Sequence, residues 1–359
     1  MRRLSRRFSV GSAVALTAAL VLLVAAMPAL AAQTITGAGA TFPLPLYQKW
    51  ASDYNKKTGD QVSYSGGGSS FGIAQIKAKA VDFGGSDAPL TKSQLNSSGL
   101  AQFPTCVGGV AIVYNIPGVG PGQLRLTGAV AAKIFMGDIT KWNSSAIKKL
   151  QTSTVAKKLP NTAITVVRRS DGSGTTWIFT NYLGGISTQF RNEVGIGKSV
   201  NWPVGVGGAG NPGVANLVKT TPGAIGYVEY AYAKQNKIAW AQLKNRAGKW
   251  VKPNSTSFAA AAANTRWSWG NGYYEILVNK PGKGTWPITG ATFVLVQRNQ
   301  KSVAFGKALL KFFDYCLTNS VARKAALALD YVPMPANAAS SIKSMWKTTI
   351  KSGGKPCWP

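Results

Sequence analysis

The sequence of 359 residues contains no histidine. Without imidazole the chain cannot build a Ser-His-Asp or Cys-His catalytic site, the usual zinc-hydrolase ligand sets or the common proton shuttle of neutral pH. Carboxylates are also scarce, with 11 Asp and Glu against 41 Lys and Arg. Since few groups change charge in acid, we expect a protein suited to an acidic exterior; a stability curve that collapses between about pH 3 and pH 5 would contradict this.

The apolar run at the N-terminus is too short for a typical membrane-spanning helix. Arginines at positions 2, 3, 6 and 7 precede it, and Ala29-Leu30-Ala31 has the small residues of a signal-peptidase site. Residues 1–31 are therefore predicted to be a cleaved signal peptide, with a retained anchor as the alternative. Ser5-Arg6-Arg7-Phe8 hints at twin-arginine export, which leaves the route open. No cysteine follows the cleavage site, so we expect a periplasmic or secreted protein without a lipid anchor.

Cysteine is rare, with three residues in the chain. An odd number in an exported protein leaves one thiol unpaired. Cys106 lies in an apolar stretch and is predicted to be an inert, buried thiol. Cys316 lies in an apolar helical run and Cys357 near the C-terminus, so we predict a disulfide between them. Such a bridge would hold the tail and contribute roughly 4 kcal/mol in the chain-entropy model.

Negative charge is so scarce that the protein is strongly basic. The four arginines of the signal leave with it, so the 41 basic and 11 acidic residues leave a mature formal charge of +26. This charge attracts anions, and by itself it would equally favour nucleic acid or anionic lipid. The lysines are scattered, however, and no basic arm or nucleic-acid motif occurs, so we expect no nucleic-acid partner.

The length of the mature chain predicts two lobes. Roughly 330 residues are more than one hydrophobic core usually serves. Residues 108–115 read as a continuous buried strand and are predicted to make the first crossing between lobes, and residues 292–296 the return crossing. Residues 303–317 and 342–350 carry apolar side chains at helical spacing and are predicted to cover the first lobe.

A strand near the centre of the chain ends abruptly in glycines and hydroxyls. Arg169, Asp171, Ser173 and Thr175 follow the apolar residues 164–167 and precede a helix with aromatic residues on one face. A helix N-terminus attracts anions, and the planar guanidinium of Arg169 can donate two hydrogen bonds to an oxyanion. Asp171 could orient that guanidinium. A capped helix with a solvated arginine pair explains the same residues, and this segment alone does not separate the two interpretations.

The same succession of strand, small-residue turn and helix occurs twice more. Residues 37–43 follow a short strand and include Thr41, and residues 66–70 follow another and include Ser69. Small residues let backbone amides approach a ligand. Three such helix starts that converge would form an anion site, whereas scattered ones would be three helix caps.

One carboxylate stands where an anion site does not need it. Asp87 follows the strand-like residues 81–84 and precedes a turn and a capping box that begins at Thr91. A turn-forming role explains it locally. In a site, Asp87 would accept a hydrogen bond from phosphate, which still carries a proton near neutral pH, and would repel sulfate, which carries none. Sites of this kind reject an analogue lacking the donor by about 10⁴ or more.

Taken in order, these segments resemble the periplasmic phosphate-binding protein of the high-affinity ABC phosphate transporter. The resemblance runs from about residue 36 to 351 and rests on long motifs: Gly37-Ala38-Gly39-Ala40-Thr41-Phe42-Pro43, Val81-Asp82-Phe83-Gly84 with Ser86-Asp87-Ala88-Pro89, Arg168-Arg169 with Asp171-Gly172-Ser173-Gly174-Thr175, and residues 222–235. It implies a two-lobed α/β periplasmic-binding-protein fold of type II, the Venus flytrap, with mixed sheets joined by two crossover strands. Lobe I would comprise residues 32–110 and 287–359, and lobe II residues 111–286.

The resemblance also implies a site and partners. Inorganic phosphate would be bound for delivery to the membrane permease subunits of an ABC importer, by a protein that we expect to be a monomer without enzymatic activity, cofactor or metal. Asp87 would accept the ligand's proton and Asp171 would orient Arg169. The implied phosphate-binding residues are Thr41, Phe42, Ser69, Asp87, Arg169, Asp171, Ser173, Gly174 and Thr175.

Three other functions account for less of the sequence. A binding protein for another oxyanion, such as sulfate or molybdate, would gain nothing from Asp87. A secreted phosphatase would need a base or metal, yet Ser173 has no histidine and Asp87 with Asp171 makes a poor metal set. A cationic adhesive protein would account for the charge but not for the ordered motifs.

Overall fold

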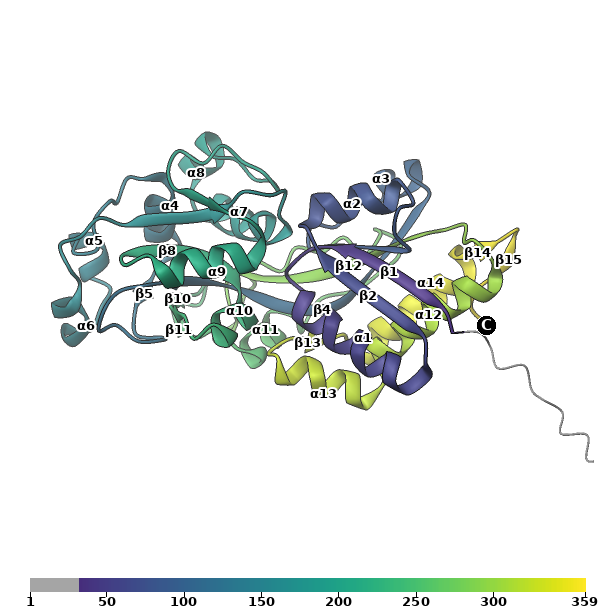
Figure 1. Ribbon diagram of the computed structural model, residues 1–359. Coiled ribbons are helices and arrows are strands. Elements are labelled where there is room, and N and C mark those ends of the chain that lie inside the picture. The colour runs from purple at the N-terminus through teal and green to yellow at the C-terminus, as the bar shows by residue number, and fades with distance from the viewer. Residues whose placement is uncertain (1–31) are drawn as a thin grey trace, which may run out of the picture. The chain divides into compact units, whose positions relative to one another are not determined.

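Strands and helices alternate through residues 32–359, the part of the chain that this computed structural model describes (Figure 1). The predicted signal peptide, residues 1–31, lies outside the described residues. Within residues 32–359, no helix is long and apolar enough to cross a membrane.

The helices are α1 (Leu44–Thr58), α2 (Ser69–Lys77), α3 (Lys92–Ser97), α4 (Gly128–Met136), α5 (Ser145–Lys148), α6 (Ser153–Lys158), α7 (Gly174–Ile186), α8 (Thr188–Glu193), α9 (Gly210–Thr220), α10 (Tyr230–Gln235), α11 (Ser255–Ala262), α12 (Val303–Thr318), α13 (Ser320–Ala328) and α14 (Ala336–Thr349). The strands are β1 (Thr34–Gly39), β2 (Gln61–Gly66), β3 (Phe83–Ser86), β4 (Leu100–Tyr114), β5 (Arg125–Leu126), β6 (Thr165–Arg169), β7 (Val206–Gly208), β8 (Ala224–Glu229), β9 (Ala239–Trp240), β10 (Gln242–Lys244), β11 (Trp250–Val251), β12 (Thr289–Gln297), β13 (Val332–Pro333), β14 (Lys351–Ser352) and β15 (Lys355–Pro356).

The main sheet is mixed. Its strands follow the order β2-β1-β3-β12-β4-β8-β6-β7, and β9 and β13 pair with β4 outside this path. β1 runs parallel to β2 and β3, and β6 parallel to β7 and β8. β12 and β4 run antiparallel to their neighbours. The predicted α/β class with mixed sheet pairing is therefore confirmed.

β4 joins two halves of this sheet (Figure 1). The first half contains β2, β1, β3 and β12, and the second half contains β8, β6 and β7. Its residues 100–109 pair with β12, and residues 110–114 pair with β8. All fifteen residues are buried, as expected for a central strand covered on both faces. The crossing strand predicted at residues 108–115 is confirmed, but it begins eight residues earlier. Periodicity did not reveal this start, because Gln102, Pro104 and Thr105 interrupt the apolar run.

The chain returns beside β4, where Val110 N donates to Ile288 O at 2.8 Å just before β12 begins. The register of β12 against β4 shifts between Thr292, which pairs with Cys106, and Phe293, which pairs with Pro104. Proline has no N–H to give to the ladder, and the shift leaves Thr105 as an extra residue. Thr292 stands at this bulge and hydrogen-bonds the candidate site residue Asp87.

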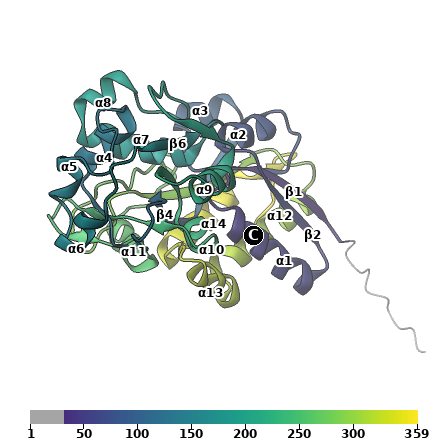
Figure 2. The same ribbon diagram turned by 60° about the vertical axis from the view of Figure 1, so that its left-hand side comes forward.

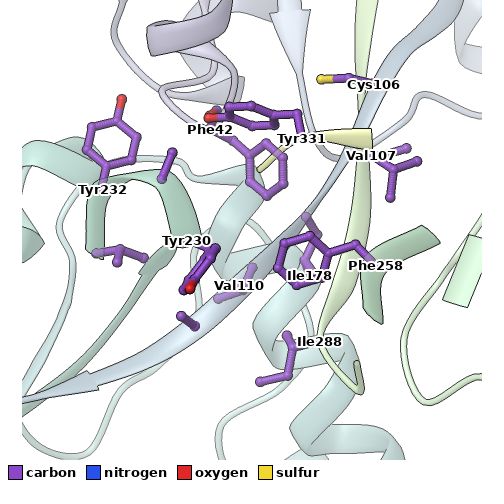
Figure 3. Close-up of a cluster of buried hydrophobic side chains, with 14 of the residues drawn as sticks. Phe42, Cys106, Val107, Val110, Ile178, Tyr230, Tyr232, Phe258, Ile288 and Tyr331 are labelled. Carbon is purple, nitrogen blue, oxygen red and sulfur yellow. The ribbon is translucent and has the colours of Figure 1, made fainter. Parts of the chain in front are cut away.

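Aromatic side chains from both halves of the sheet pack around β4 (Figure 3). The rings of Phe42 and Tyr331 lie 6.2 Å apart edge to face, and those of Tyr230 and Phe258 lie 5.9 Å apart in the same manner. Such pairs add about 0.5–1.5 kcal/mol each to the burial of their surface. The crossing strand is therefore embedded in a continuous core to which both halves contribute.

Helices cover the sheet in two groups (Figure 2). α12 packs on β4 and contacts α1, α13 and α14, which confirms that the predicted C-terminal helices cover the first half. α9 packs on β6, β7 and β8, and α7 packs on α4 and β8 of the second half. The helices α2, α7 and α9 begin at the site described below.

The predicted disulfide between Cys316 and Cys357 is not formed. All three cysteines are free and buried. A Cβ added to Gly306 would lie 2.5 Å from Cys357 Sγ, so that thiol sits near the start of α12. Cys316 lies ten residues further along the same helix, about 15 Å away at 1.5 Å per residue. Sulfur atoms in a disulfide are only about 2 Å apart. The C-terminal tail is instead held by packing of Trp358 on Trp346.

Candidate functional site

The first turns of α2 and α7 lie against each other, although they belong to different halves of the sheet. Ser70 N, in the first turn of α2, donates to Gly172 O, just before α7, at 2.9 Å. The amides of Ser69, Gly174 and Thr175 occupy first-turn positions, where no intrahelical carbonyl is available. Two helix N-termini thus bring unpaired donors and positive dipole ends to one place.

Gly174 lies against Ser69 and Asp87, so the three residues belong to the same site. A Cβ added to Gly174 would lie 2.4 Å from Ser69 Oγ and 2.5 Å from Asp87 Oδ2, closer than a real side chain allows. Asp87 N donates to Ser69 Oγ at 3.1 Å. The absence of a side chain at Gly174 is therefore what lets the two halves approach to this distance.

Arg169 is buried, which excludes the solvated arginine of the alternative interpretation. Its Nε donates to Asp171 Oδ1 at 2.7 Å, its Nη2 bonds Asp171 Oδ2, and its Nη1 donates to Thr175 Oγ1 at 3.2 Å. Burial acts to raise the pKa of Asp171, but the hydrogen bonds and charge of Arg169 hold that pKa below its ordinary value. The guanidinium is thus oriented by Asp171, as the resemblance implied.

The helix-cap interpretation is correct for Ser173 and incomplete for the site. Ser173 is the N-cap of α7, and its Oγ accepts from Thr176 N at 3.0 Å. That bond uses an oxygen lone pair and leaves the hydroxyl proton free to donate. Capping and anion binding are therefore compatible at this residue.

Asp87 is almost completely buried at the contact between the halves. Its Oδ1 accepts from Thr292 Oγ1 at 2.7 Å. Burial raises the pKa of Asp87 to about 7, although Thr292, the charge of Arg169 and the Ser69 hydroxyl act to lower it. The carboxyl group therefore exchanges its proton close to neutral pH.

The raised pKa of Asp87 predicts a pH dependence of stability in the ligand-free protein. Because the folded-state pKa exceeds the ordinary value of 3.8, this stabilisation is complete below about pH 4 and is lost as the pH rises through 7. Asp87 alone should lower the free energy of unfolding by about 2–3 kcal/mol from pH 5 to pH 8. Urea unfolding at both pH values should show a smaller difference for Asp87→Asn. Equal differences would contradict the pKa; Glu229, whose pKa is also raised, contributes with the same sign in both proteins.

Two tyrosines hold the loop that contains Thr41 and Phe42. Tyr232 OH donates to Thr41 O at 2.6 Å, and Tyr331 OH donates to Phe42 O at 2.7 Å. Thr41 O and Phe42 N belong to one peptide group, which is planar and trans. The Phe42 N–H therefore points away from the Thr41 carbonyl, and the bond from Tyr232 fixes the direction of both groups. The sequence patterns did not identify either tyrosine, because the contacts form between residues about 190 and 290 positions apart.

Asn211 links the two halves at the centre of the site and was missed by sequence reasoning. Its backbone N and Nδ2 both donate to Thr41 Oγ1 at 3.0 Å, and Nδ2 also donates to Thr175 Oγ1 at 3.1 Å. β7, one residue and then α9 repeat the strand–turn–helix succession a fourth time. This repetition is a usable signal, although the many glycines of residues 202–213 fit an irregular loop equally well.

A second buried carboxyl group lies behind the site. Glu229 Oε2 lies 2.8 Å from Tyr331 OH and accepts from Ala231 N at 2.9 Å, while Oε1 has no hydrogen-bond partner. Burial raises the pKa of Glu229 well above its ordinary value, which favours the neutral carboxyl group. A neutral Glu229 adds no repulsion toward an anion in the site.

The predicted site residues from both halves are brought together. Hydroxyls, first-turn amides and one guanidinium supply donors, and Asp87 supplies the acceptor. Among residues 32–359, no three Cys, Asp or Glu side chains form a group that could hold a metal ion. Such an arrangement suits a small oxyanion that carries one hydrogen, since amide and hydroxyl dipoles spread its charge.

The fold and the site define a two-lobed binding protein, with donors contributed by both halves of one mixed sheet. The sequence model of the PBP superfamily domain matches residues 25–320. The chain is 50% identical over 328 residues to the phosphate-binding protein PstS of Pasteurella multocida, covering 91% of this chain and 94% of that protein. It is 48% identical over 331 residues to PstS of Haemophilus influenzae, covering 92% and 98%.

The chain belongs to the PstS family of phosphate-binding proteins, a family of binding proteins and not of enzymes. Among solved structures, the phosphate-binding protein from Stenotrophomonas maltophilia is similar with a TM-score of 0.65 at 20% identity, covering 90% of this chain and 97% of that one. At this identity the structural likeness supports the two-lobed fold alone.

Proposed function

We propose that this protein binds inorganic phosphate outside the cytoplasm and delivers it to an ABC-type phosphate importer. The proposed ligand contacts are the hydroxyls of Thr41, Ser69, Ser173 and Thr175, the amides of Phe42, Ser69, Gly174 and Thr175, the Arg169 guanidinium and the Asp87 carboxylate. Asp171 acts through Arg169. The family membership supports the ligand class and the transporter partner.

One observation carries the proposal: a single buried carboxylate, Asp87, faces a set of donors that come from both halves. A site made only of donors would accept sulfate and phosphate alike. A carboxylate in that position gains from a ligand that donates a hydrogen bond, and it opposes a ligand that has no proton. Phosphate has that proton near neutral pH.

Binding would close one lobe on the other. We infer that residues 32–110 with 287–359 form one lobe and residues 111–286 the second, with β4 and the segment before β12 as the connections. Contacts such as Ser70 N to Gly172 O join these two parts directly. The protein would act as a monomer, periplasmic or secreted after removal of residues 1–31, and without a nucleic-acid partner.

Titration calorimetry of the purified mature protein, stripped of bound ligand, tests this function. Phosphate should bind tightly, sulfate at least about 10⁴-fold more weakly, and phosphonates in between, because they keep an ionisable oxygen but lose one acceptor. Equal affinity for phosphate and sulfate would contradict the assignment of Asp87. Absence of phosphate binding would contradict the function itself.

Gly174→Ala should weaken phosphate binding about 100-fold or more. The added methyl group would lie within 2.5 Å of Ser69 Oγ and Asp87 Oδ2, so the halves could not approach as closely. Gly185→Ala, in the same helix, is the matched control because a Cβ there meets nothing within 4 Å. Calorimetry should show normal phosphate affinity for the control, and the same affinity for both variants would contradict the close approach.

A further inference from the structure

An anion site needs hydroxyl groups that donate, yet a hydroxyl can equally accept. Ser and Thr side chains rotate their O–H toward whichever acceptor lies nearby. If N–H donors occupy the oxygen lone pairs, the proton of the hydroxyl is left to point elsewhere. Residues that supply those N–H groups therefore determine whether a threonine presents a donor to the ligand.

Thr41 Oγ1 receives two such donors from one residue. Asn211 N and Asn211 Nδ2 each lie 3.0 Å from this oxygen. With both lone pairs engaged, the Thr41 hydroxyl keeps only its donor function. The contacts join the loop before α1 to the first turn of α9.

Thr175 Oγ1 also accepts hydrogen bonds from two N–H groups. Asn211 Nδ2 donates to it at 3.1 Å, and Arg169 Nη1 donates to it at 3.2 Å. Two N–H groups again occupy the acceptor positions, so the Thr175 hydroxyl is left to donate. One amide group of Asn211 therefore acts on two candidate ligand-binding hydroxyls.

The orientation of the Asn211 amide is fixed by its other end. Glu229 N donates to Asn211 Oδ1 at 2.8 Å, and a backbone N–H can only donate. The oxygen must therefore face Glu229, and the NH₂ group must face the two threonines. The Asn211 side chain is fully buried, so water does not compete for these bonds.

We propose that Asn211 is a positioning residue for phosphate binding, which directs the hydroxyl protons of Thr41 and Thr175 toward the ligand. This role rests on the proposed function. It also couples donor direction to closure, because Asn211 lies in residues 111–286 and Thr41 in residues 32–110. The Thr41 hydroxyl becomes an obligatory donor when the two parts meet.

Calorimetric phosphate titrations of Asn211→Ala and Asn211→Asp test the role. Asn211→Ala should weaken binding about 10- to 100-fold, the range for hydrogen bonds to a charged group. Asn211→Asp keeps the shape but replaces the NH₂ donor by an acceptor, so both hydroxyls turn toward it and binding should weaken further than in Asn211→Ala. A merely structural role predicts the reverse order, because alanine leaves a cavity and aspartate does not.

Asn245→Ala is the matched control for loss of a buried asparagine. Asn245 Nδ2 donates to the carbonyls of Gly282, Lys283 and Thr285, and none of these is a candidate ligand contact. The control should lower the melting temperature of the ligand-free protein and leave phosphate affinity unchanged. A loss of affinity equal to that of Asn211→Ala would overturn the proposed role.

A double-mutant cycle separates the hydroxyl effect from the added charge of Asn211→Asp. In a Thr41→Val, Thr175→Val background the further change Asn211→Ala should cost less than about threefold, because no hydroxyl remains to direct. Full additivity would overturn the role of Asn211 while leaving phosphate binding established. Absence of phosphate binding by the unmodified protein would overturn both this role and the proposed function.

Discussion

Replacing Arg169 by alanine is expected to weaken phosphate binding roughly 30- to 4,000-fold, equivalent to about 2–5 kcal/mol. Two effects combine. The ligand loses a buried guanidinium, and Asp171 loses the partner that occupies both of its oxygens. The carboxylate, which would keep its bond from Gly210 N but lose its cationic partner, adds repulsion toward the anion. Calorimetric titration of ligand-stripped Arg169→Ala with phosphate measures the loss.

Arg168→Ala is the matched control for this experiment. Arg168 precedes Arg169 on β6 and, since strand side chains alternate, points to the opposite face, where it is partly exposed. It removes the same charge from the protein but not from the site, so its phosphate affinity should stay within about threefold of the unmodified protein at moderate salt. Equal losses of phosphate affinity in both variants would mean that the net charge of the protein determines binding and that the buried guanidinium of Arg169 does not.

The second large effect is expected on selectivity. Asp87→Asn should lower the preference for phosphate over sulfate at least about 100-fold, because an amide can donate to an oxygen that carries no proton and has no negative charge to repel sulfate. The carbonyl oxygen of the new amide can still accept from Thr292, so the fold should survive. Competition calorimetry, with phosphate displaced by sulfate, measures the ratio directly.

Asp82→Asn provides the corresponding control for Asp87→Asn. Asp82 is a well-paired carboxylate five residues earlier, bonded to Thr36 and Lys301 and outside the site. It should change stability and leave the ratio of phosphate to sulfate affinity unaltered. An unchanged ratio in Asp87→Asn would refute the selector role of that carboxylate.

Local patterns were sufficient for much of the fold and for most candidate residues. The abrupt change from β-branched residues to glycines and hydroxyls after residue 167 predicted the β6 to α7 turn, and the same pattern predicted the start of α2 at Ser69. These signals are local because strand periodicity, glycine turns and helix starts depend on neighbouring residues. The pairing of Cys316 with Cys357 failed because it depends on distance along α12, which spacing in the chain does not reveal.

By itself, then, the sequence determined the α/β class, the absence of imidazole chemistry, and an ordered set of motifs that identify the family. Only the tertiary structure decided that Arg169 is buried, that Asp87 is desolvated at the contact between the halves, and that Asn211 bonds two threonines at once. The reason is physical: burial, pKa and hydroxyl direction are set by groups that lie far away in the chain, and only folding brings them within hydrogen-bonding distance.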